Sequence, residues 1–402
     1  MGITNEIEKR YRMSGYHKRD PEPFPAGKLK RVDRPTTIIE DDNIRRVSQR
    51  DSGFNKAARG LYGPAFISGP FGDPLSGAES RMLQMMRRLP EGMVAARKAP
   101  IPEDPRLLSR HIKETAYFLR ADTVGICKLP PYAVYSYNYD PDNPDSPGFP
   151  VELTHKYAVA ILIDQDWRTA SAFTGSDWIS NSMSFLAYSN SGFIAVILAD
   201  YIRRLGYPAQ AHYSGNYQVV VPPILLWAGL GEMSRIGDIV VNPFLGPRFK
   251  AAVVTTDMPL FPDKPIDFGL QDFCSKCKKC ARECPSGALS YGGKEMFNGY
   301  EKWPVNVEQC AKMRGGRRNN GAGCGTCIKV CPWNKPYTPF HRAVGWAMRN
   351  SSIARSIAIR GDDLMGYGKT DYRKKWWFDL ADFKGDGVLQ IPDKDNTNKS
   401  SR

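Results

Sequence analysis

The sequence lacks any long apolar run. No uninterrupted stretch approaches the roughly 20 apolar residues that a helix needs to cross a bilayer, and the best candidates, Phe193–Ala199 and Pro222–Gly229, are short. Met1–Arg50 also lacks the apolar core of a secretory signal peptide, and no hydrophobic stretch follows Arg45-Arg46. The chain is therefore expected to be soluble, as a mature form whose leader has been removed.

The chain also lacks a basic block of the kind that binds nucleic acid, although its net charge is +14. The positive charges are dispersed along the sequence. A basic surface favours anionic partners such as nucleic acid, an anionic membrane face or an acidic electron donor. The alternative is that the charge serves only solubility, and both interpretations stay open.

Cysteine is absent from most of the chain and concentrated in one stretch. Eight of the nine cysteines lie in the runs C-x2-C-x2-C-x3-C-P and C-x13-C-x2-C-x3-C-P. This spacing is typical of two [4Fe–4S] clusters, in which the fourth cysteine of each run ligates the other cluster. We therefore assign the metal-ligating thiols to two sets. The first set is Cys274, Cys277, Cys280 and Cys331, and the second set is Cys284, Cys310, Cys324 and Cys327.

Two other interpretations of these cysteines are weaker. Zinc sites generally use two separated C-x2-C pairs, whereas these runs contain a third nearby cysteine and end in Cys-Pro. A disulfide framework is typical of short secreted chains, and this chain is long. Two clusters side by side form a path for single electrons, so a redox centre is expected at its end. The remaining Cys127 is expected to be a buried apolar residue.

The chain divides into four predicted parts. Residues 1–120 are rich in Pro and Arg and are expected to wrap around the rest of the protein. Residues 121–265 are predicted to form an α/β (α+β) core. Residues 266–340 form a predicted two-cluster ferredoxin-like domain, and residues 341–402 a C-terminal segment that packs back on the core.

Strand and helix patterns alternate within the predicted core. Strands are expected at Thr123–Leu129, Lys156–Asp164 and Lys250–Thr256, because these stretches are short, apolar and rich in β-branched residues. A helix is predicted over Ser189–Leu205, with Gly206 ending it. The alternation predicts a mixed sheet.

Three stretches outside the cysteine runs carry a resemblance to a known family. They are Ser191 to Tyr207, the Gly-rich run Gly229 to Gly237, and Asn242 to Leu260, which contains Asn-Pro-Phe-Leu-Gly-Pro-Arg and Thr-Asp-Met-Pro-Leu. With the cysteine runs, in this order, they make the chain similar to the catalytic subunit of cobalamin-dependent reductive dehalogenases of the respiratory type. The resemblance covers about residues 120–340.

The resemblance implies both a fold and cofactors. These enzymes hold a base-off cobalamin, a corrinoid, in a core similar to the nitroreductase fold, with a domain carrying two [4Fe–4S] clusters attached. Corrinoid proteins that supply a His ligand often use Asp-x-His-x-x-Gly. That motif is absent here, because Gln210 stands at the Asp position before His212.

The implied reaction replaces a carbon–halogen bond by a carbon–hydrogen bond, consumes two electrons and one proton, and releases halide. By resemblance, Tyr188 is the proton donor. Arg248 is the expected basic residue beside it, with Arg235 as its rival, and Asn216 helps to hold the substrate or halogen. A neighbouring guanidinium favours the tyrosinate. The alternatives are a packing role for Tyr188, a corrinoid amide or a surface carboxylate as the partner of Arg248, and a turn for Asn216.

The cofactor-binding residues expected by resemblance are spread over the core and the cluster domain. The Gly-rich run lets the backbone approach a large planar ligand, although it could equally be a plain connection. Tyr300 and Trp303 either fold over the substrate pocket or shield a cluster. The expected cofactor-binding residues are Ser191, Gly231, Ser234, Arg235, Gly237, Thr256, Trp333 and Asn334.

Two other functions stay open. Epoxyqueuosine reductases, which act on tRNA with cobalamin and two clusters, have motifs similar to Cys331-Pro-Trp-Asn334 and Thr256–Leu260, and positive charge suits tRNA. They usually carry a helical-repeat domain after the clusters, whereas only about 70 residues follow here. A ferredoxin-type electron carrier would hold no corrinoid.

The resemblance also implies a location and partners. Respiratory enzymes of this kind are exported folded through the twin-arginine pathway and lie on the outer face of the cytoplasmic membrane as peripheral proteins; a cytoplasmic location is the alternative. The expected partners are a small organohalide, a small membrane-anchor subunit and an electron donor from the quinone pool or a membrane reductase, without nucleic acid. A homodimer is left open.

Overall fold

The structure is a computed structural model. It describes residues 22–63, 73–140, 143–315 and 323–378, together with Glu6 and Lys9. The predicted parts 1–120 and 341–402 are thus described only in part, and the rest of them lies outside the described residues. The four predicted boundaries stay predictions.

A four-stranded sheet forms the core, in the order β2-β3-β7-β4. Every neighbouring pair in it is antiparallel, so the prediction of a mixed sheet is wrong. The long excursion between β3 and β7 lets the chain re-enter the sheet from either end, so alternation alone does not fix strand direction. The strands are β2 (Thr123–Lys128), β3 (Tyr157–Asp164), β7 (Phe249–Thr256) and β4 (Ala209–His212).

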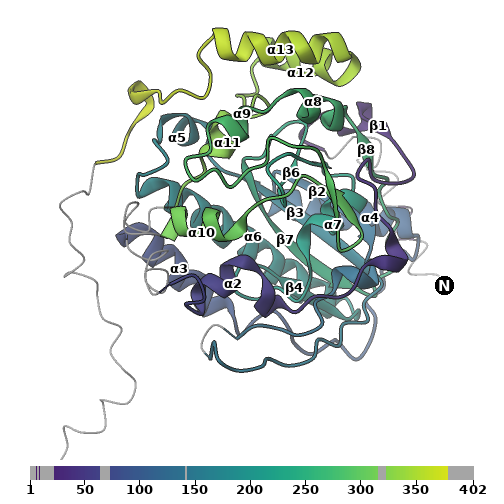
Figure 1. The fold of residues 1–402 in the computed structure, drawn as a ribbon. Helices are drawn as coiled ribbons and strands as arrows, with labels where there is room; N and C mark the ends of the chain where they lie inside the picture. Colours follow the sequence, from purple (N-terminus) through teal and green to yellow (C-terminus); the bar gives the residue numbers. More distant parts are fainter. Residues whose placement is uncertain are drawn as a thin grey trace, which may run out of the picture.

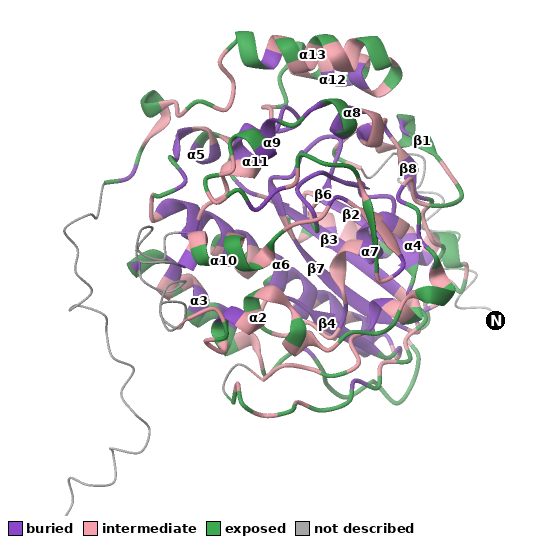
Figure 2. Cartoon of the chain, in the orientation of Figure 1, coloured by how far each residue is buried: buried purple, intermediate pink, exposed green. Residues whose placement is uncertain are grey.

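Both faces of this sheet are covered, which explains why its central strands are buried along most of their length and largely apolar (Figure 2). Val159 and Ile161 of β3 join the cluster on the α6 side. Ala160 and Leu162 join the cluster on the α7 side, together with the buried Cys127. The helices around the sheet are α3 (Pro74–Met86), α4 (Pro105–Phe118), α5 (Trp167–Ala172), α6 (Ile179–Arg204) and α7 (Val221–Trp227).

The long helix α6 packs on β7, β4 and β3 (Figure 1). It begins at Ile179, ten residues before the predicted start at Ser189. Its first turns are rich in Ser and Asn, which favour caps and turns over helix interiors. Here tertiary contacts keep them helical; for example, the Ser182 hydroxyl donates to Asp73 Oδ1 at 2.9 Å. α6 has the length and apolar composition of a membrane span, but over half of its most apolar window is buried in the protein.

The cysteine runs lie in a module of short elements beside the core. The N-terminal part contributes β1 (Lys30–Arg31), which pairs with β8 (Ile266–Asp267) at the start of this module. The two-stranded ribbon of β5 (Glu232–Met233) and β6 (Val240–Val241) borders it. The module elements are α8 (Leu270–Lys276), α9 (Lys279–Arg282), β9 (Glu295–Phe297), β10 (Tyr300–Lys302), α10 (Val307–Gly315) and α11 (Thr326–Val330).

A helical hairpin of α12 (Pro339–Asn350) and α13 (Ser352–Leu364) covers the module (Figure 1). A buried ion pair fixes it, because Asp362 accepts from Lys279 Nζ at 2.6 Å, and Lys279 lies between two cysteines of the first set. Farther along, the Trp376 indole donates to Thr169 of α5 at 2.9 Å. The described C-terminal residues therefore contact both the module and the core.

The remaining short elements connect these parts. They are α2 (Gly53–Ala58) and the 3-10 helices η2 (Ala26–Lys28), η3 (Asp41–Asn43), η4 (Gln49–Asp51), η7 (Pro131–Ala133) and η9 (Tyr372–Lys374).

Candidate functional site

Tyr188 lies within α6, half-buried on the side that faces β7. The ammonium nitrogen of Lys250, the second residue of β7, lies 4.9 Å from the centre of the Tyr188 ring. Phe185 packs on the same ring at 6.4 Å. The contact is of the cation–π kind, with the ammonium against the face of the ring. Lys250 is thus a basic residue beside Tyr188 that the sequence analysis missed.

One signal in the sequence could have found Lys250. It is the one charged residue in β7, which otherwise reads Phe-x-Ala-Ala-Val-Val-Thr-Thr, and a lysine in a buried strand calls for a partner or a function.

Arg248 joins the core to the cysteine module. Its side chain is buried and donates to both carboxylate oxygens of Asp164 at 2.9 Å. It also donates to Asn334 Oδ1, just after the second cysteine run. Burial raises the pKa of Asp164 to about 6, and the charge of Arg248 opposes that shift only in part. The carboxylate partner that was weighed as an alternative is therefore present, while a role of Arg248 beside Tyr188 stays a prediction.

Asn216 lies in the turn that follows β4. Its side-chain amide donates to the Ala211 carbonyl at 3.3 Å, and its backbone N–H donates to the Tyr213 carbonyl at 2.8 Å. The next residue, Tyr217, donates its hydroxyl to the Ala251 carbonyl at 2.6 Å. Burial raises the pKa of Tyr217, and Tyr188 raises it further. Asn216 is thus next to a tyrosine that interacts with Tyr188, but its own bonds are those of a turn.

Arg235 lies against the first cysteine set. Its buried guanidinium donates to the Cys274 carbonyl at 2.8 Å and to the carbonyls of Ser290 and Gly292 at 3.0 and 2.9 Å. It also lies 5.0 Å from the centre of the Trp303 ring. Trp303 packs in the same apolar cluster as Cys274, so it shields these thiols. Arg235 is therefore a buried cation of the module.

The Gly-rich run is closely packed against protein atoms. Gly237 has φ +84°, and a Cβ on it would lie 2.6 Å from Val305. The Ser234 hydroxyl donates to the Ile239 carbonyl at 2.7 Å across the β5–β6 turn. A Cβ on Gly231 would meet the backbone of Val241. These contacts fit the simple connection that was weighed as the alternative, and cofactor binding here stays a prediction.

The hydroxyls of Ser191 and Thr256 donate hydrogen bonds to nearby backbone carbonyls. Ser191 donates to the Tyr188 carbonyl at 3.0 Å, so it fixes the helix at the turn that carries Tyr188. Thr256 donates to the Pro208 carbonyl at 2.6 Å. Both are completely buried.

Trp333 and Asn334 directly follow the second cysteine run. The Trp333 ring is buried and edge-on to Phe268 and Phe273, with ring centres 4.9 and 5.8 Å apart. Its indole N–H is buried without a hydrogen-bond partner in the described part of the chain. Asn334 bridges the Lys329 carbonyl and the Arg248 guanidinium. Trp333 and Asn334 therefore tie the second run to α8 and to the core.

The thiols of each predicted set lie close enough to affect one another's pKa, and the assignment of ligands to two clusters stays a prediction. Burial raises the pKa of Cys331 most, and the neighbouring thiols of Cys274, Cys277 and Cys280 raise it further. Burial raises the pKa of Cys327 most, and the Cys324 and Cys310 thiols raise it further. The Cys280 thiol of the first set contributes less, which indicates that the two sets lie next to each other. Iron would supply the positive charge that buried thiolates need.

The disulfide interpretation of the cysteines finds no support in the structure. The nine cysteines are all free, so a disulfide framework is wrong.

The N-terminal half of α6 has the polar character that an amide-rich ligand such as a corrinoid needs. The buried hydroxyls of Ser180, Ser182 and Ser184 on α6 all donate within the protein. The side-chain oxygen of Gln165, whose amide donates to Ser184, has no partner in the described part of the chain. Unpaired buried polar atoms are uncommon and call for a ligand or water.

His212 is not positioned as a metal ligand. Its Nε2 lies 2.9 Å from the Thr255 hydroxyl, and its Nδ1 accepts from the Gln218 N–H at 3.4 Å. Burial lowers the pKa of His212 to about 3, so the ring is neutral. Both ring nitrogens are used within the fold.

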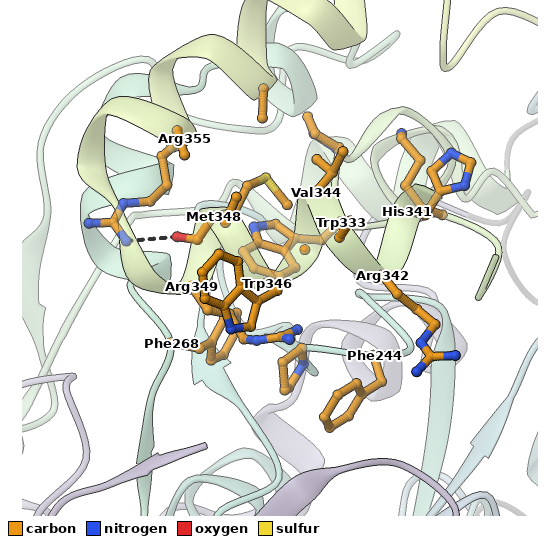
Figure 3. Close-up of a pocket in the computed structure, with 18 of the residues that line it drawn as sticks. Phe244, Phe268, Trp333, His341, Arg342, Val344, Trp346, Met348, Arg349 and Arg355 are labelled. Carbon is orange, nitrogen blue, oxygen red and sulfur yellow. Dashed lines mark hydrogen bonds between the residues drawn. The ribbon is translucent and has the colours of Figure 1, made fainter. Parts of the chain in front are cut away.

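A cavity of about 1140 Å³ opens elsewhere, between the α12–α13 hairpin and the cysteine module (Figure 3). Trp333, Phe268 and Phe244 line it from one side, and Trp346 and Arg349 from α12. Tyr188 and Lys250 are not part of its lining, so it is separate from the site on α6 and β7.

Comparison with known proteins places this arrangement in a family. A family model described as a 4Fe-4S double cluster binding domain matches residues 273–334. Tetrachloroethene reductive dehalogenase from Sulfurospirillum multivorans is 32% identical over 311 residues, which are 70% of this chain and 61% of that protein. A catabolic reductive dehalogenase, solved in complex with 3-bromo-4-hydroxybenzoic acid, superposes with a TM-score of 0.84 at 40% identity, over 91% of this chain and 53% of that one. The chain belongs to the reductive dehalogenase family.

Two further reductive dehalogenases are similar to this chain. The tetrachloroethene enzyme from Desulfitobacterium hafniense is 33% identical over 223 residues, 53% of this chain and 39% of that protein. A structure that suggests a mechanism for B12-dependent dehalogenation superposes with a TM-score of 0.85 at 40% identity, over 91% of this chain and 53% of that one. The chain spans about 40 to 60% of the length of these relatives.

The rival family is also similar, over a shorter stretch. Epoxyqueuosine reductase from Escherichia coli is 26% identical over 160 residues, 35% of this chain. Three predictions are confirmed: the reductive dehalogenase family, the α/β fold and the double-cluster module.

Proposed function

We propose that this protein is a reductive dehalogenase that replaces a carbon–halogen bond by a carbon–hydrogen bond, using cobalamin fed by two [4Fe–4S] clusters. The observation that carries the proposal is the cation–tyrosine pair of Lys250 and Tyr188, on a core joined to eight grouped thiols. When bound, the cobalamin supplies reduced cobalt for carbon–halogen cleavage, and the clusters supply single electrons.

Tyr188 is the proposed proton donor, and Lys250 is the proposed group that makes donation easier. When the hydroxyl proton of Tyr188 moves to the substrate carbon, a phenolate remains. The ammonium of Lys250, 4.9 Å from the ring centre, stabilises that negative charge without first having to reorganise. Half-burial strengthens this interaction relative to water. Arg248 remains the second candidate for this role, and Asn216 the candidate for holding the halogen.

The cofactors would be held by distinct parts of the chain. Cys274, Cys277, Cys280 and Cys331 would ligate one cluster, and Cys284, Cys310, Cys324 and Cys327 the other, as the mutual effects on the pKa values of these thiols support. The corrinoid would lie beside the polar half of α6. The engagement of both His212 nitrogens supports a base-off cobalamin without a His ligand.

The proposed substrate is a small organohalide, and the proposed setting is organohalide respiration. Relatives act on tetrachloroethene by name, and a solved neighbour holds a brominated hydroxybenzoic acid, so both chlorinated ethenes and halogenated phenols are candidates. By analogy with respiratory enzymes, we infer a location on the outer face of the cytoplasmic membrane. The inferred partners are a small membrane-anchor subunit and an electron donor linked to the quinone pool, and the chain could assemble as a homodimer.

The test is anaerobic purification and reconstitution with hydroxocobalamin, followed by metal analysis and a halide-release assay. About eight irons and one cobalt per chain are expected, with halide released from tetrachloroethene or 3-bromo-4-hydroxybenzoate when reduced viologen is present. Eight irons without cobalt would leave a ferredoxin-type electron carrier. Conversion of epoxyqueuosine in a tRNA stem-loop, without halide release, would favour the tRNA enzyme.

A further inference from the structure

The cavity under α12 and α13 has a cationic and aromatic lining. We call it the hairpin groove and define it by Lys28, Phe244, Trp333, Arg342, Trp346 and Arg349 (Figure 3). Its rim carries large exposed apolar side chains: Trp346 is 64% exposed, and Phe340 and Ile357 are 55% and 65% exposed. Exposed aromatic and aliphatic side chains of this size are typical of a surface that binds a macromolecule.

The charge of the groove is positive. The lining carboxylates are neutralised, because Asp267 pairs with Lys30 and Asp362 pairs with Lys279. In contrast, the groove cations Lys28, Arg342 and Arg349 have no carboxylate within ion-pair distance in the described ranges. Arg342 and Arg349 lie instead over the rings of Tyr337 and Phe244, at 5.2 and 5.6 Å. The groove therefore complements an acidic partner.

The groove lies against the first cysteine set. Trp333 follows Cys331-Pro332 directly, and its buried ring separates the groove from α8, which carries Cys274. Cys274, Cys277, Cys331 and Trp333 belong to one apolar cluster. An electron that arrived in the groove would thus meet the first cluster.

The second cysteine set lies beside the helix that carries Tyr188. Next to Cys324, Gly323 lies against Asn181 of α6, with its Cβ position 3.4 Å from the Asn181 backbone. Asn181 precedes Tyr188 by two turns of the same helix. An electron that entered the first cluster from the groove would therefore have the second cluster between it and the helix that carries Tyr188.

We propose that the hairpin groove is the docking surface for an acidic electron-donor protein, which reduces the first cluster. The proposal rests on the proposed function, since it needs the two clusters. In each transfer one electron leaves the reduced donor and the first cluster gains it, and no bond forms or breaks. The apolar rim contributes contact area, while the unpaired cations steer an acidic partner to it.

The test uses the reconstituted full chain and reduced flavodoxin as an acidic one-electron donor. The variant is Lys28→Glu with Arg342→Glu, at two exposed positions of the groove. Its matched control is Lys128→Glu with Lys156→Glu, at two exposed positions on β2 and just before β3, with the same change in net charge. Stopped-flow bleaching of the cluster absorbance gives the rate of reduction, at low and high ionic strength. Reduced propyl viologen sulfonate, which carries a single net negative charge, serves as a small reductant that does not need a docking surface.

Reversal of the groove charges should lower the second-order rate of reduction by flavodoxin about tenfold at low salt and weaken its salt dependence. The control should change that rate by less than about twofold, because Lys128 and Lys156 are not part of the groove lining. Reduction by the viologen should stay unchanged in both, which shows that the clusters are intact.

Three results would overturn the proposal. Equal rates for the groove variant and its control would place docking elsewhere. Slower reduction by the viologen as well would assign the effect to the cluster. A change from dimer to monomer in sedimentation, without a change in the flavodoxin rate, would assign the groove to a second copy of this chain. Failure of the proposed function is a separate result, because a protein without cobalt would still be reduced but would release no halide.

Discussion

The ammonium nitrogen of Lys250 lies 4.9 Å from the centre of the Tyr188 ring, although 61 residues separate the two in the chain. The contact forms because Tyr188 lies on α6, Lys250 lies on β7, and the two elements pack along much of their length. A cation in this position stabilises a phenolate more than a phenol. The pair is therefore suited to give up a proton and to hold the resulting charge.

Tyr188→Phe should abolish most turnover while leaving the cofactors in place. The substitution removes the hydroxyl but keeps the ring on which Phe185 packs, so the fold should be unaffected. Loss of a positioned proton donor costs about 10²- to 10⁴-fold in rate. Halide release, measured with iron and cobalt contents equal to wild type, checks this. A variant that retains full turnover would remove Tyr188 from the mechanism.

Lys250→Met should lower turnover by about 10- to 100-fold, because the phenolate of Tyr188 would lose its counter-charge. Lys250→Arg keeps the charge and should recover part of the activity. Arg248→Lys provides the comparison, since Arg248 is held by Asp164 and Asn334. If Arg248→Lys loses more turnover than Lys250→Met at equal cofactor content, Arg248 is the basic residue of the site.

The thiols, Lys250 and Arg235 differ in how far the sequence could predict their surroundings. The spacing of cysteines predicted two thiol sets, because ligands close in sequence must be close in space. The contact of Lys250 with Tyr188 is tertiary, so no spacing reveals it. Arg235 stands in a Gly-rich run that suggested a ligand site, yet its donors are used by the carbonyls of Cys274, Ser290 and Gly292. Which partner a buried arginine finds depends on packing.

The fold, too, could be predicted only in part from the sequence. The apolar strands Tyr157–Asp164 and Phe249–Thr256 follow the predicted ranges closely, because burial on both faces leaves a strong pattern. The start of α6 was missed, because the serines of its first turns are helical only through contacts such as that of Ser182 with Asp73. The antiparallel direction of the sheet depends on long connections, which carry no local signal.

Arg235→Gln should shift the reduction potential of the first cluster to a more negative value. The substitution removes a buried positive charge beside Cys274, and reduction adds negative charge there. A shift on the order of 50 mV is expected, since a tenfold change in a one-electron equilibrium corresponds to about 59 mV. Potentiometric titration followed by electron paramagnetic resonance checks this. Arg235→Lys should stay near wild type in potential, and the second cluster should not move in either variant; equal shifts of both clusters would contradict this account.

Glu79 should make the protein less stable as the pH rises. It lies half-buried on α3, and one of its carboxylate oxygens lacks a partner in the described part of the chain. Burial raises the pKa of its carboxyl group from 4.5 to about 8, and the negative charge of Asp73 adds to this shift. Between these values the folded state keeps a proton that the unfolded chain has lost, so the free energy of unfolding falls with increasing pH. Glu79→Gln should flatten this dependence between pH 5 and pH 8 in thermal unfolding. An unchanged slope would show that Glu79 is not its source.

Asp362→Asn should loosen the α12–α13 hairpin and expose the first cluster. Asp362 is 5% exposed and pairs with Lys279 and Lys335. Its loss leaves the largely buried Lys335 without a counter-charge and Lys279 with Asp363 alone. Breaking a buried pair in this way costs about 3–5 kcal/mol. The variant should therefore bleach faster in air, as followed by cluster absorbance, and unfold at a lower denaturant concentration. Asp371→Asn, which breaks pairs with the more exposed Arg373 and Lys374, is the matched control and should behave like wild type. If the two variants bleached at the same rate, the buried pair would not be what protects the cluster, and the shielding would have to come from the aromatic packing of Trp333 and Trp303.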